Sequence, residues 1–442
     1  MWWSKSGKYL AYLTLNDTLV DNISLTYYPE KAVYPVIVSF PYSKVGTPIP
    51  TVTVNVWNKQ SGQTTQLRPP DELTNEADGY YVLRVSWVNT ASNEEVFVAW
   101  ANRVQNLVYL TTCSVDTGNC AKNFQQNYTD YWAQPSSFDL TQGAASEYFL
   151  LLPEEQDGNF FSHVSALPPS TRKTDSPTFL TNGAFEVNKI VGYNKESEKL
   201  VSMAKNEKGV SMCLTCDLKK KCGYVNVYFS PAGTYYMLEC RGPGIPYSDV
   251  VVTATQKSVF TIENNDRLHE YMKHKKMPLV RFQEIPLNDN YKAIVKYVLP
   301  HDFYESSSVK HPLILKVYAG PDSQAVTDTW LFRSKQSAFE ASMTSERKYA
   351  VVYIDGRGSA NRGSKYLKPV YKNLGVHETE DQINAFKKIL SNENFSKTDT
   401  AVWGWSYGGF STGKIAEMDG FKTFKCASSV APVTYFVYYG KS

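Results

Sequence analysis

The segment that decides the fold is AVWGWSYGGF, residues 401–410. It places Ser406 between Gly404 and Gly408 in the pattern G-x-S-x-G, after an apolar run and before a segment that is compatible with a helix. In such a strand–turn–helix elbow, the serine hydroxyl is exposed at the end of a sheet, and the next backbone N–H points toward a developing oxyanion. The alternative is a glycine-rich turn that carries a serine by chance. Because a strand and a helix are expected on its two sides, we interpret Ser406 as a nucleophile.

The segments before the elbow are typical of a doubly wound sheet. HPLILKVYAG and YAVVYIDGRG have the apolar runs of buried strands, and a helix is expected from about residue 378 to 390. Strands and helices that alternate in this way form a mostly parallel sheet, which binds ligands at the carboxyl ends of its strands. Tyr318 follows one of these strands. Its hydroxyl is therefore a candidate donor to an oxyanion, with an ordinary core tyrosine as the alternative.

The first part of the chain has a different pattern. From residue 8 to about 260, turn residues separate short alternating or apolar strands such as YPVIVSF, TVTVNVW and YYVLRVSWV. This pattern favours a sandwich, a barrel or a propeller. Near IENNDRLHEYMKHKKMP the apolar period changes toward that of a helix and charges accumulate, which predicts a helical connector. We therefore expect two domains, residues 1–264 and residues 265–442.

Composition limits the partners of the protein. The 442 residues carry a formal net charge of +3, and 20% of them are charged. No nucleic-acid partner is expected, because the clustered basic surface that it requires is missing. No run reaches the apolar length of a membrane span, and the residues after Met1 lack the features of a signal peptide. The candidates for glycosylation are the N-x-[ST] sequons at Asn16, Asn22, Asn127 and Asn394.

Six of the seven cysteines stand in two groups. The groups are Cys113 with Cys120, and Cys213, Cys216, Cys222 and Cys240. A C-x-x-C pair opens the second group, so a zinc site is one interpretation. We favour local disulfides, which require an oxidising compartment, and expect no metal, because the last two cysteines lie far apart on what we expect to be successive strands. Cys426 is left over, either as a free buried thiol or with a partner outside the printed sequence.

Several motifs resemble those of one serine peptidase family. In the second part of the chain these motifs are GWSYGG, VYAGP, DGRGS, NLGVHETEDQI and FKCASSVAPV. In the first part they are WWSKSGKYLAYLTLNDT, RVQN, CLTC, KKKC and CRGPGIP. Together they resemble the dipeptidyl peptidase IV and fibroblast activation protein branch of the prolyl oligopeptidase family. The resemblance is weak around residues 125 to 205. It implies a β-propeller followed by an α/β-hydrolase domain, both incomplete in this chain, with five or six blades instead of eight.

The resemblance also implies roles for single residues. Ser406 matches the nucleophile, and the Tyr407 N–H and the Tyr318 hydroxyl match the oxyanion hole. Three residues match the wall of the pocket for the residue before the scissile bond: Val433, Phe436 (where the family carries tryptophan) and Tyr439. The matching disulfides are Cys113 with Cys120, Cys213 with Cys216, and Cys222 with Cys240. Cys426 matches a cysteine whose partner lies far downstream, beyond Ser442.

Two parts of the family's machinery are not expected in the printed sequence. After the elbow the acids are Glu417 and Asp419, both on the segment expected to be a helix, and no histidine follows. We therefore expect the triad to lack its acid and base and the chain as printed to be inactive. Upstream histidines such as His311 and His377 lie in segments that this topology does not bring to the serine.

The second missing part is a pair of glutamates that binds the α-amino group of the substrate. The resemblance implies that this pair precedes the WWS segment, and so precedes Met1. Glu94 and Glu95 are a similar pair on a later blade, which we interpret as a solvated turn.

The elbow and the resemblance together favour a serine dipeptidyl peptidase or a fragment of one. The resemblance implies that it releases dipeptides with proline or alanine in second place and needs no cofactor. The alternative is a catalytically inactive relative that binds through its propeller; a generic esterase would not explain the first half of the chain. The resemblance implies a parent protein that is a homodimer, either anchored in the plasma membrane as a type II protein or secreted.

Overall fold

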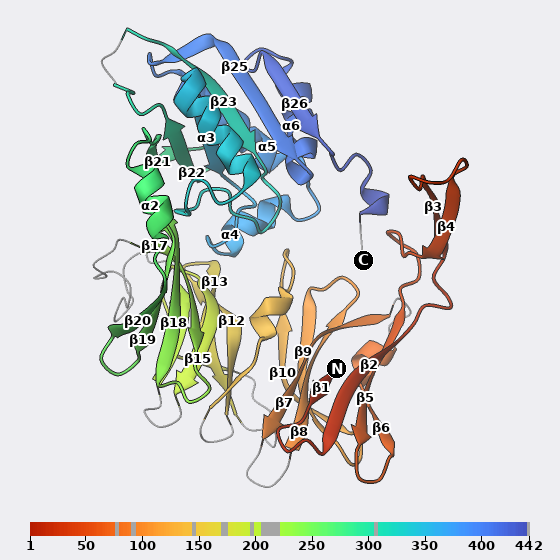
Figure 1. Ribbon diagram of the computed structural model, residues 1–442. Coiled ribbons are helices and arrows are strands. Elements are labelled where there is room, and N and C mark those ends of the chain that lie inside the picture. The colour runs from red at the N-terminus through yellow and green to blue at the C-terminus, as the bar shows by residue number, and fades with distance from the viewer. Residues whose placement is uncertain are drawn as a thin grey trace.

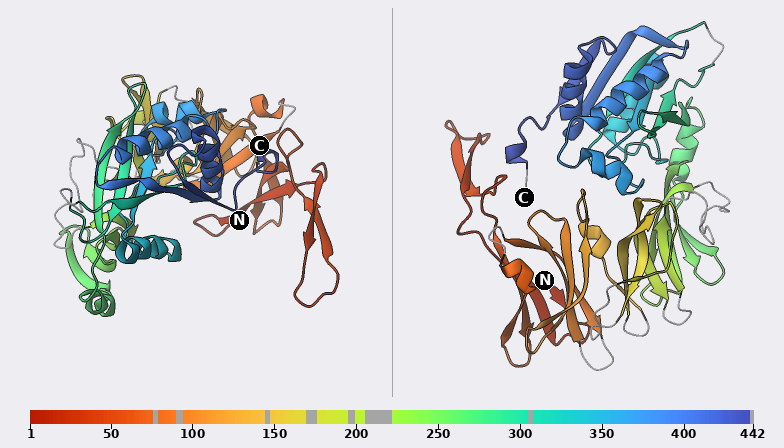
Figure 2. Two further views of the ribbon diagram at one scale, coloured as in Figure 1. Left: turned by 90° about the horizontal axis from the view of Figure 1, so that it is seen from above. Right: turned by 180° about the vertical axis from the view of Figure 1, so that it is seen from behind.

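The fold has two parts, a row of antiparallel sheets followed by a larger sheet that helices flank (Figure 1). The computed structural model describes residues 1–75, 79–89, 94–143, 147–168, 176–194, 199–204, 222–304 and 308–439. The first part is red to green in Figures 1 and 2, and the second part is green to blue.

Four-stranded antiparallel sheets dominate the first part. The first sheet contains β1 (Trp2–Trp3), β2 (Tyr9–Asn16), β5 (Thr51–Asn58) and β6 (Thr64–Leu67), and the second contains β10 (Cys120–Asn127), β9 (Leu107–Ser114), β8 (Glu94–Asn102) and β7 (Tyr80–Asn89). The third contains β11 (Thr141–Gln142), β12 (Tyr148–Gln156), β13 (Asn159–Leu167) and β14 (Thr178–Phe179). A further sheet contains β17 (Cys222–Phe229), β18 (Tyr235–Pro243), β19 (Tyr247–Val252) and β20 (Lys257–Glu263).

Among the described residues, two pairs of strands and two short helices complete the first part. β15 (Val187–Asn194) pairs with β16 (Lys199–Ala204), and β3 (Asn22–Tyr27) pairs with β4 (Val36–Pro41). The helices are α1 (Asp71–Thr74) and the 3-10 helix η1 (Pro135–Phe138). With β15–β16 the described residues form five blade-like sheets, in agreement with the five or six expected.

Strand β8 shows why these sheets stack. Its sequence EEVFVAWAN is almost continuously apolar, and the side chains of successive residues point to opposite faces of a sheet. One face packs toward the first sheet with Val96, Val98 and Trp100, and the other packs toward the third sheet with Phe97, Ala99 and Ala101. A strand buried on both faces therefore needs a sheet on each side, which is the packing of neighbouring propeller blades.

The hairpin β3–β4 extends away from the sheets (Figures 1 and 2). It carries apolar side chains that are exposed, among them Leu25, Tyr27, Tyr28, Val33, Tyr34, Val36, Ile37, Val38 and Phe40. The strand expected at YPVIVSF is confirmed as β4, but its pattern is the same as that of a blade strand and so does not predict a separate hairpin.

The second part is the expected doubly wound, mostly parallel sheet. Its strands follow in the order β21 (Leu279–Pro286), β22 (Lys292–Leu299), β24 (Ala350–Asp355), β23 (His311–Val317), β25 (Phe395–Trp405) and β26 (Cys426–Val430). β21, β22 and β24 pair antiparallel, and the remaining pairs are parallel. The propeller region followed by an α/β-hydrolase region confirms the predicted fold class.

Helices cover both faces of this sheet. The described helices of the second part are α2 (Asp266–Met272), α3 (Lys335–Arg347), α4 (Ser364–Leu367), α5 (His377–Leu390) and α6 (Tyr407–Asp419), with the 3-10 helices η2 (Lys368–Val370) and η3 (Phe436–Tyr438). α3 packs on one face through Ala341, and α5 and α6 pack on the other through Phe386 and Ile415. The helix expected at about residues 378 to 390 is α5, and α2 lies in the segment expected to be a helical connector.

The disulfide interpretation is confirmed at two of its three pairs. Cys113 and Cys120 bridge the paired strands β9 and β10, and Cys222 and Cys240 bridge β17 and β18. Cys213 and Cys216 lie outside the described residues. Cys426 lies on β26 as a thiol, and it is exposed and not buried.

Two expectations about surface residues are wrong. Asn394 is only 6% exposed, and its side-chain amide donates to Asn392 Oδ1 at 2.9 Å, so it does not present a glycosylation site; Asn16, Asn22 and Asn127 are exposed. Glu94 begins strand β8 and is half-buried, so it is not in a solvated turn. It accepts the backbone N–H of Ser6 at 2.8 Å, which links the turn between β1 and β2 to the second sheet.

Carboxylates line part of the junction between the two parts. Glu186 accepts the N–H groups of Ser162 at 2.8 Å and of Gly363, in the second part, at 3.0 Å. Gln134 donates to Asp322, also in the second part, at 2.5 Å. Burial raises the pKa of Glu186 to about 7 and that of Asp322 to about 6, because the charged forms lose hydration there.

We expect Asp322→Asn to stabilise the protein at neutral pH. Because the folded state raises the pKa of Asp322 from 3.8 to about 6, stability falls as the pH rises through this window, and the loss is complete above it. Asparagine keeps an acceptor for Gln134 and tolerates the positive φ of 57° at this position. At pH 7.5 the variant should gain on the order of 1 kcal/mol in free energy of unfolding, and at pH 4 it should match the wild type.

Urea unfolding at both pH values measures this difference. Asp157→Asn is the matched control, since Asp157 has a φ of 52° but is exposed in the β12–β13 turn. A gain of the same size at pH 4 and pH 7.5 would contradict the electrostatic explanation.

Candidate active site at the nucleophile elbow

Ser406 lies in a strained turn between β25 and α6. Its φ of 59° and ψ of −121° are a backbone conformation that residues with a side chain rarely adopt, and such positions cost about 1–3 kcal/mol. Hydrogen bonds hold it there: the Ser406 N–H donates to Val430 O at 3.0 Å, and its carbonyl accepts from the N–H groups of Gly409 at 2.9 Å and Phe410 at 3.1 Å. The strained serine is the geometry expected of a nucleophile elbow.

Three glycines allow the backbone segments around Ser406 to approach one another. A Cβ on Gly404 would lie 2.3 Å from Gly408 O, and one on Gly408 would lie 2.4 Å from Val317 O. A Cβ on Gly409 would lie 2.7 Å from Val430 O. Since each contact is with backbone, no side chain can move aside to make room. The motif G-x-S-x-G-G is therefore required by the packing of α6 against β23, β25 and β26.

The structure brings both residues expected in the oxyanion hole to this elbow. Tyr407 is the first residue of α6, so its N–H has no partner within the helix and lies at the positive end of the helix dipole. Tyr318 follows β23, the strand beside β25, and its ring centroid lies 6.3 Å from that of Tyr407. Burial, and then the nearby Tyr439, raise the pKa of Tyr318, so its hydroxyl stays protonated and able to donate.

The expected pocket-wall residues follow β26. The ring of Phe436 packs against Phe410 at 5.0 Å, Tyr407 at 6.3 Å and Tyr439 at 6.1 Å between centroids. Val433 is half-buried and Tyr439 is 58% exposed. Phe436 and Tyr439 therefore lie beside the aromatic side chains of the elbow.

Glu378 is a residue of this site that the sequence analysis missed. Its side chain is buried, and its Oε1 accepts the Tyr407 hydroxyl at 2.7 Å and the Gly375 N–H at 2.5 Å. Burial and the adjacent Glu378 raise the pKa of Tyr407, which keeps this hydroxyl a donor. An acid in the first turn of a helix is common, so the sequence held no signal for this contact.

The acids of α6 have structural contacts. Glu417 is exposed and pairs with Lys414 at 2.7 Å. Asp419 is buried and accepts the N–H groups of Thr423 at 2.6 Å and Phe424 at 3.1 Å, which holds the chain as it leaves the helix. Neither carboxylate is available to orient a histidine at Ser406.

His311 does not reach the elbow. It lies at the amino end of β23, opposite Phe395, whereas Val317 at the other end lies opposite Gly404. At about 3.3 Å per residue, the strand separates His311 from the elbow by roughly 20 Å. Its Nδ1 is also bound to Lys348 O at 2.8 Å.

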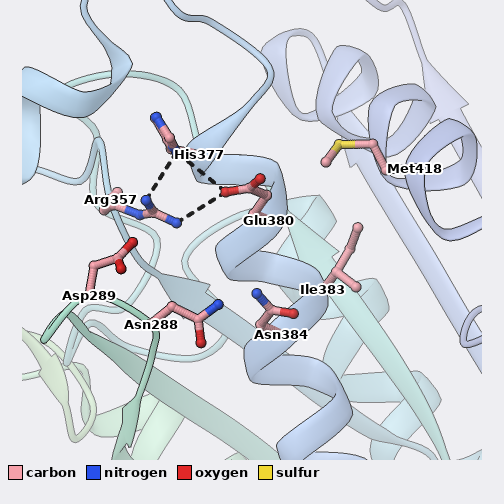
Figure 3. A pocket seen from close by; sticks show the side chains of 8 residues that line it. All are labelled: Asn288, Asp289, Arg357, His377, Glu380, Ile383, Asn384 and Met418. Carbon is pink, nitrogen blue, oxygen red and sulfur yellow. Dashed lines mark hydrogen bonds and ion pairs between the residues drawn. The ribbon is translucent and has the colours of Figure 1, made fainter.

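His377 lines a cavity of about 550 Å³ (Figure 3). His377 Nδ1 lies 3.0 Å from Arg357 Nη1 and 3.3 Å from Glu380 Oε2. Arg357 also pairs with Glu380 at 3.3 Å and with the buried Asp381 at 2.6 Å, which neutralise its charge. The imidazole of His377 is thus held by its own neighbours, and Ser406 is not among the residues of this cavity.

We expect Ser406→Gly to be more stable than Ser406→Ala by about 1 kcal/mol, because only glycine relieves the strain of the positive φ. Both variants lack the hydroxyl, so thermal unfolding of the pair isolates the backbone effect. An alanine variant at least as stable as the glycine variant would show that the turn is not strained.

We expect Glu378→Ala to lower the free energy of unfolding by about 1–3 kcal/mol, since it leaves the buried Tyr407 hydroxyl without an acceptor. Glu378→Gln keeps an acceptor oxygen and should cost less, and the exposed Glu417→Ala should change stability by less than about 0.5 kcal/mol. Urea unfolding compares the three variants. Equal losses for Glu378→Ala and Glu378→Gln would mean that the hydrogen bond is not what stabilises the elbow.

Comparison with known proteins agrees with this geometry. The family described as dipeptidyl peptidase IV N-terminal region matches residues 1–247, and the prolyl oligopeptidase family matches residues 334–442. The chain is 32% identical to dipeptidyl peptidase family member 1 of Caenorhabditis elegans, over 99% of this chain and 57% of that protein. It is 31% identical to venom dipeptidyl peptidase 4 of Vespula vulgaris, over 99% of this chain and 58% of that protein.

A further relative carries the name inactive dipeptidyl peptidase 10, from Mus musculus, and is 29% identical over 98% of this chain and 55% of that protein. The crystal structure of Porphyromonas gingivalis dipeptidyl peptidase 4 superposes with a TM-score of 0.83 and 25% identity, over 98% of this chain and 60% of that chain. The chain therefore spans less than two thirds of each of these proteins. Since the N-terminal family model alone matches more than half of its residues, the protein belongs to the dipeptidyl peptidase IV branch of the prolyl oligopeptidase family.

Proposed function

We propose that the protein is a serine dipeptidyl peptidase, or a part of one, with Ser406 as its nucleophile. The supporting observation is the strained Ser406 between β25 and α6. Its Oγ would attack the carbonyl carbon after the second residue of a peptide and lose its proton to a base. The C–N bond then breaks and the amine leaves with that proton. Water hydrolyses the resulting ester, which releases the dipeptide and restores the serine.

The oxyanion of this reaction would be held by the Tyr407 N–H and the Tyr318 hydroxyl. Both groups are donors, and both lie at the carboxyl ends of neighbouring strands. The proton acceptor would be neither His311 nor His377, whose positions are described above. We propose that a residue outside the printed sequence supplies it.

The pocket for the second residue of the substrate would be formed by Val433, Phe436 and Tyr439. A compact, apolar proline ring or a small alanine side chain suits a pocket lined by aromatic rings, which is the basis for proposing peptides with proline or alanine in second place. Phe436 stands where the family resemblance implies tryptophan, so this wall has a smaller ring. The proposal includes a division into domains at residues 264 and 265, between β20 and α2.

A catalytically inactive binding protein is the second candidate. It is favoured by the similarity to a relative named inactive dipeptidyl peptidase 10. Such a protein would act through the surface of its propeller and hairpin. The strained Ser406 supports the peptidase instead, because a binding protein gains nothing from a turn that costs stability.

The setting of the protein is a further part of the proposal. We propose an extracellular, glycosylated protein that is secreted or held at the plasma membrane. This is supported by two disulfides, by a relative named as a venom enzyme, and by the exposed sequons at Asn16, Asn22 and Asn127. Among the described residues, no helix is long and apolar enough to cross a membrane. We propose that the full-length protein is a homodimer.

A fluorophosphonate probe tests the function. We expect the natively purified protein to be labelled at Ser406 and to release p-nitroaniline from X-Pro and X-Ala p-nitroanilides. In Ser406→Ala the labelling should be lost and kcat should fall by roughly 1,000-fold or more, since a triad that loses its nucleophile can lose about a million-fold in kcat. The intact mass of the labelled species identifies the chain that carries the activity. A folded native protein that is neither labelled nor active would favour the binding protein.

A further inference from the structure

The proposed pocket wall contacts the propeller at the base of the hairpin β3–β4. The hydroxyl of Tyr42 donates to Tyr438 O at 2.5 Å, and the N–H of Val45 donates to Val437 O at 3.4 Å. The ammonium group of Lys44 lies 4.7 Å from the centroid of the Tyr438 ring. Figures 1 and 2 show the same approach: the segment after β26 leaves the α/β part and extends toward the hairpin.

The α/β part alone holds this segment weakly. η3 is three residues long, and a single 3-10 turn is not stable by itself. Tyr435, Tyr438 and Tyr439 are 60%, 47% and 58% exposed. Phe436 is the member of this turn that packs on the side chains of the elbow. Contacts from outside the α/β part are therefore needed to fix the turn.

The base of the hairpin is a stiff platform for such contacts. Its turn is closed on itself, since Thr47 N–H donates to Lys44 O at 3.1 Å and Lys44 N–H donates to Thr47 Oγ1 at 2.9 Å. The guanidinium of Arg103, from the loop between β8 and β9, donates to Thr47 O. The N–H of Tyr42 donates to Asp21 O at 2.9 Å. Residues 42–47 are thus tied to both the hairpin and the second sheet.

The residues in and next to η3 contact two different parts of the protein, the elbow and the base of the hairpin. In a 3-10 helix, side chains three residues apart lie on the same side, which places Phe436 and Tyr439 together. The rings of these two residues lie 6.1 Å apart, and the ring of Phe436 packs against the rings of the elbow. Val437 and Tyr438 present their carbonyl oxygens to the hairpin base. One turn of chain therefore links the propeller to the proposed pocket.

We propose that the hairpin base positions the pocket wall, with Tyr42 and Lys44 as positioning residues for the substrate residue before the scissile bond. This inference rests on the proposed function for the identity of the pocket. Because the contacts hold the wall and not Ser406, their loss raises KM for the substrate more than it lowers kcat.

Hydrogen exchange tests the contact without requiring activity. In Tyr42→Phe and Lys44→Gln, exchange of the amides in residues 431–439 should be about 2- to 10-fold faster than in the wild type, the range expected for one lost hydrogen bond or cation–π contact. Exchange in α6 should not change. Tyr34→Phe is the matched control, since Tyr34 is 81% exposed near the tip of the same hairpin. Unchanged exchange at residues 431–439 in both variants overturns the proposal.

Kinetics of the full-length native enzyme test the consequence for the substrate. Tyr42→Phe should raise KM for X-Pro and X-Ala p-nitroanilides by about 2- to 10-fold and leave kcat within about 2-fold. Faster exchange with unchanged KM would show that the segment is held by the hairpin but is not a substrate wall, which also overturns the proposal. A wild type that neither labels at Ser406 nor cleaves these substrates refutes the proposed function, while exchange still decides whether the hairpin holds the segment.

Discussion

The close approach of three backbone segments at Gly404 and Gly408 is the constraint on which the site depends. A single Cβ at either position would meet a backbone carbonyl at 2.3–2.4 Å, so α6 could not pack as it does against β23 and β25. This packing puts the first N–H of α6 beside the end of β23, where Tyr318 follows. The strain at Ser406 is offset by the backbone hydrogen bonds of the turn, above all the one from its own N–H to Val430.

Helix α5 stabilises the elbow and the loop after β24 through two buried acidic side chains. Glu378 and Asp381 are three residues apart and so share a face of the helix. Glu378 holds the Tyr407 hydroxyl, and Asp381 accepts the backbone N–H of Arg357 at 2.7 Å as well as its guanidinium. A Cβ on Gly356 would lie 2.7 Å from the Asp381 side chain, which explains a glycine in the motif DGRGS. One helix thus fixes both the elbow and the loop after β24.

Local patterns predicted the parts of this structure that local physics determines. The elbow follows from glycine spacing between a strand and a helix, and the Cys113–Cys120 disulfide follows from two cysteines that flank a turn. Local patterns could not predict which side chains are buried. Asn394 stands in a sequon but its side chain is buried, and Glu378 is buried although it stands in what looks like an ordinary first helical turn. The neighbours of Glu94 in the chain could not reveal its contact with Ser6, because the two residues lie 88 positions apart.

The contact between Tyr42 and Tyr438 spans 396 residues, and it joins the two parts of the fold at the segment that we propose as the pocket wall. The pocket-wall segment follows β26 at the edge of the sheet, so the α/β part borders it on one side. Its exposed side chains and single 3-10 turn give it little rigidity of its own. The propeller supplies the second side through a turn that is itself hydrogen-bonded to the second sheet. In the proposed function, a pocket of fixed shape needs both parts of the fold, which makes the propeller a structural component of the proposed site.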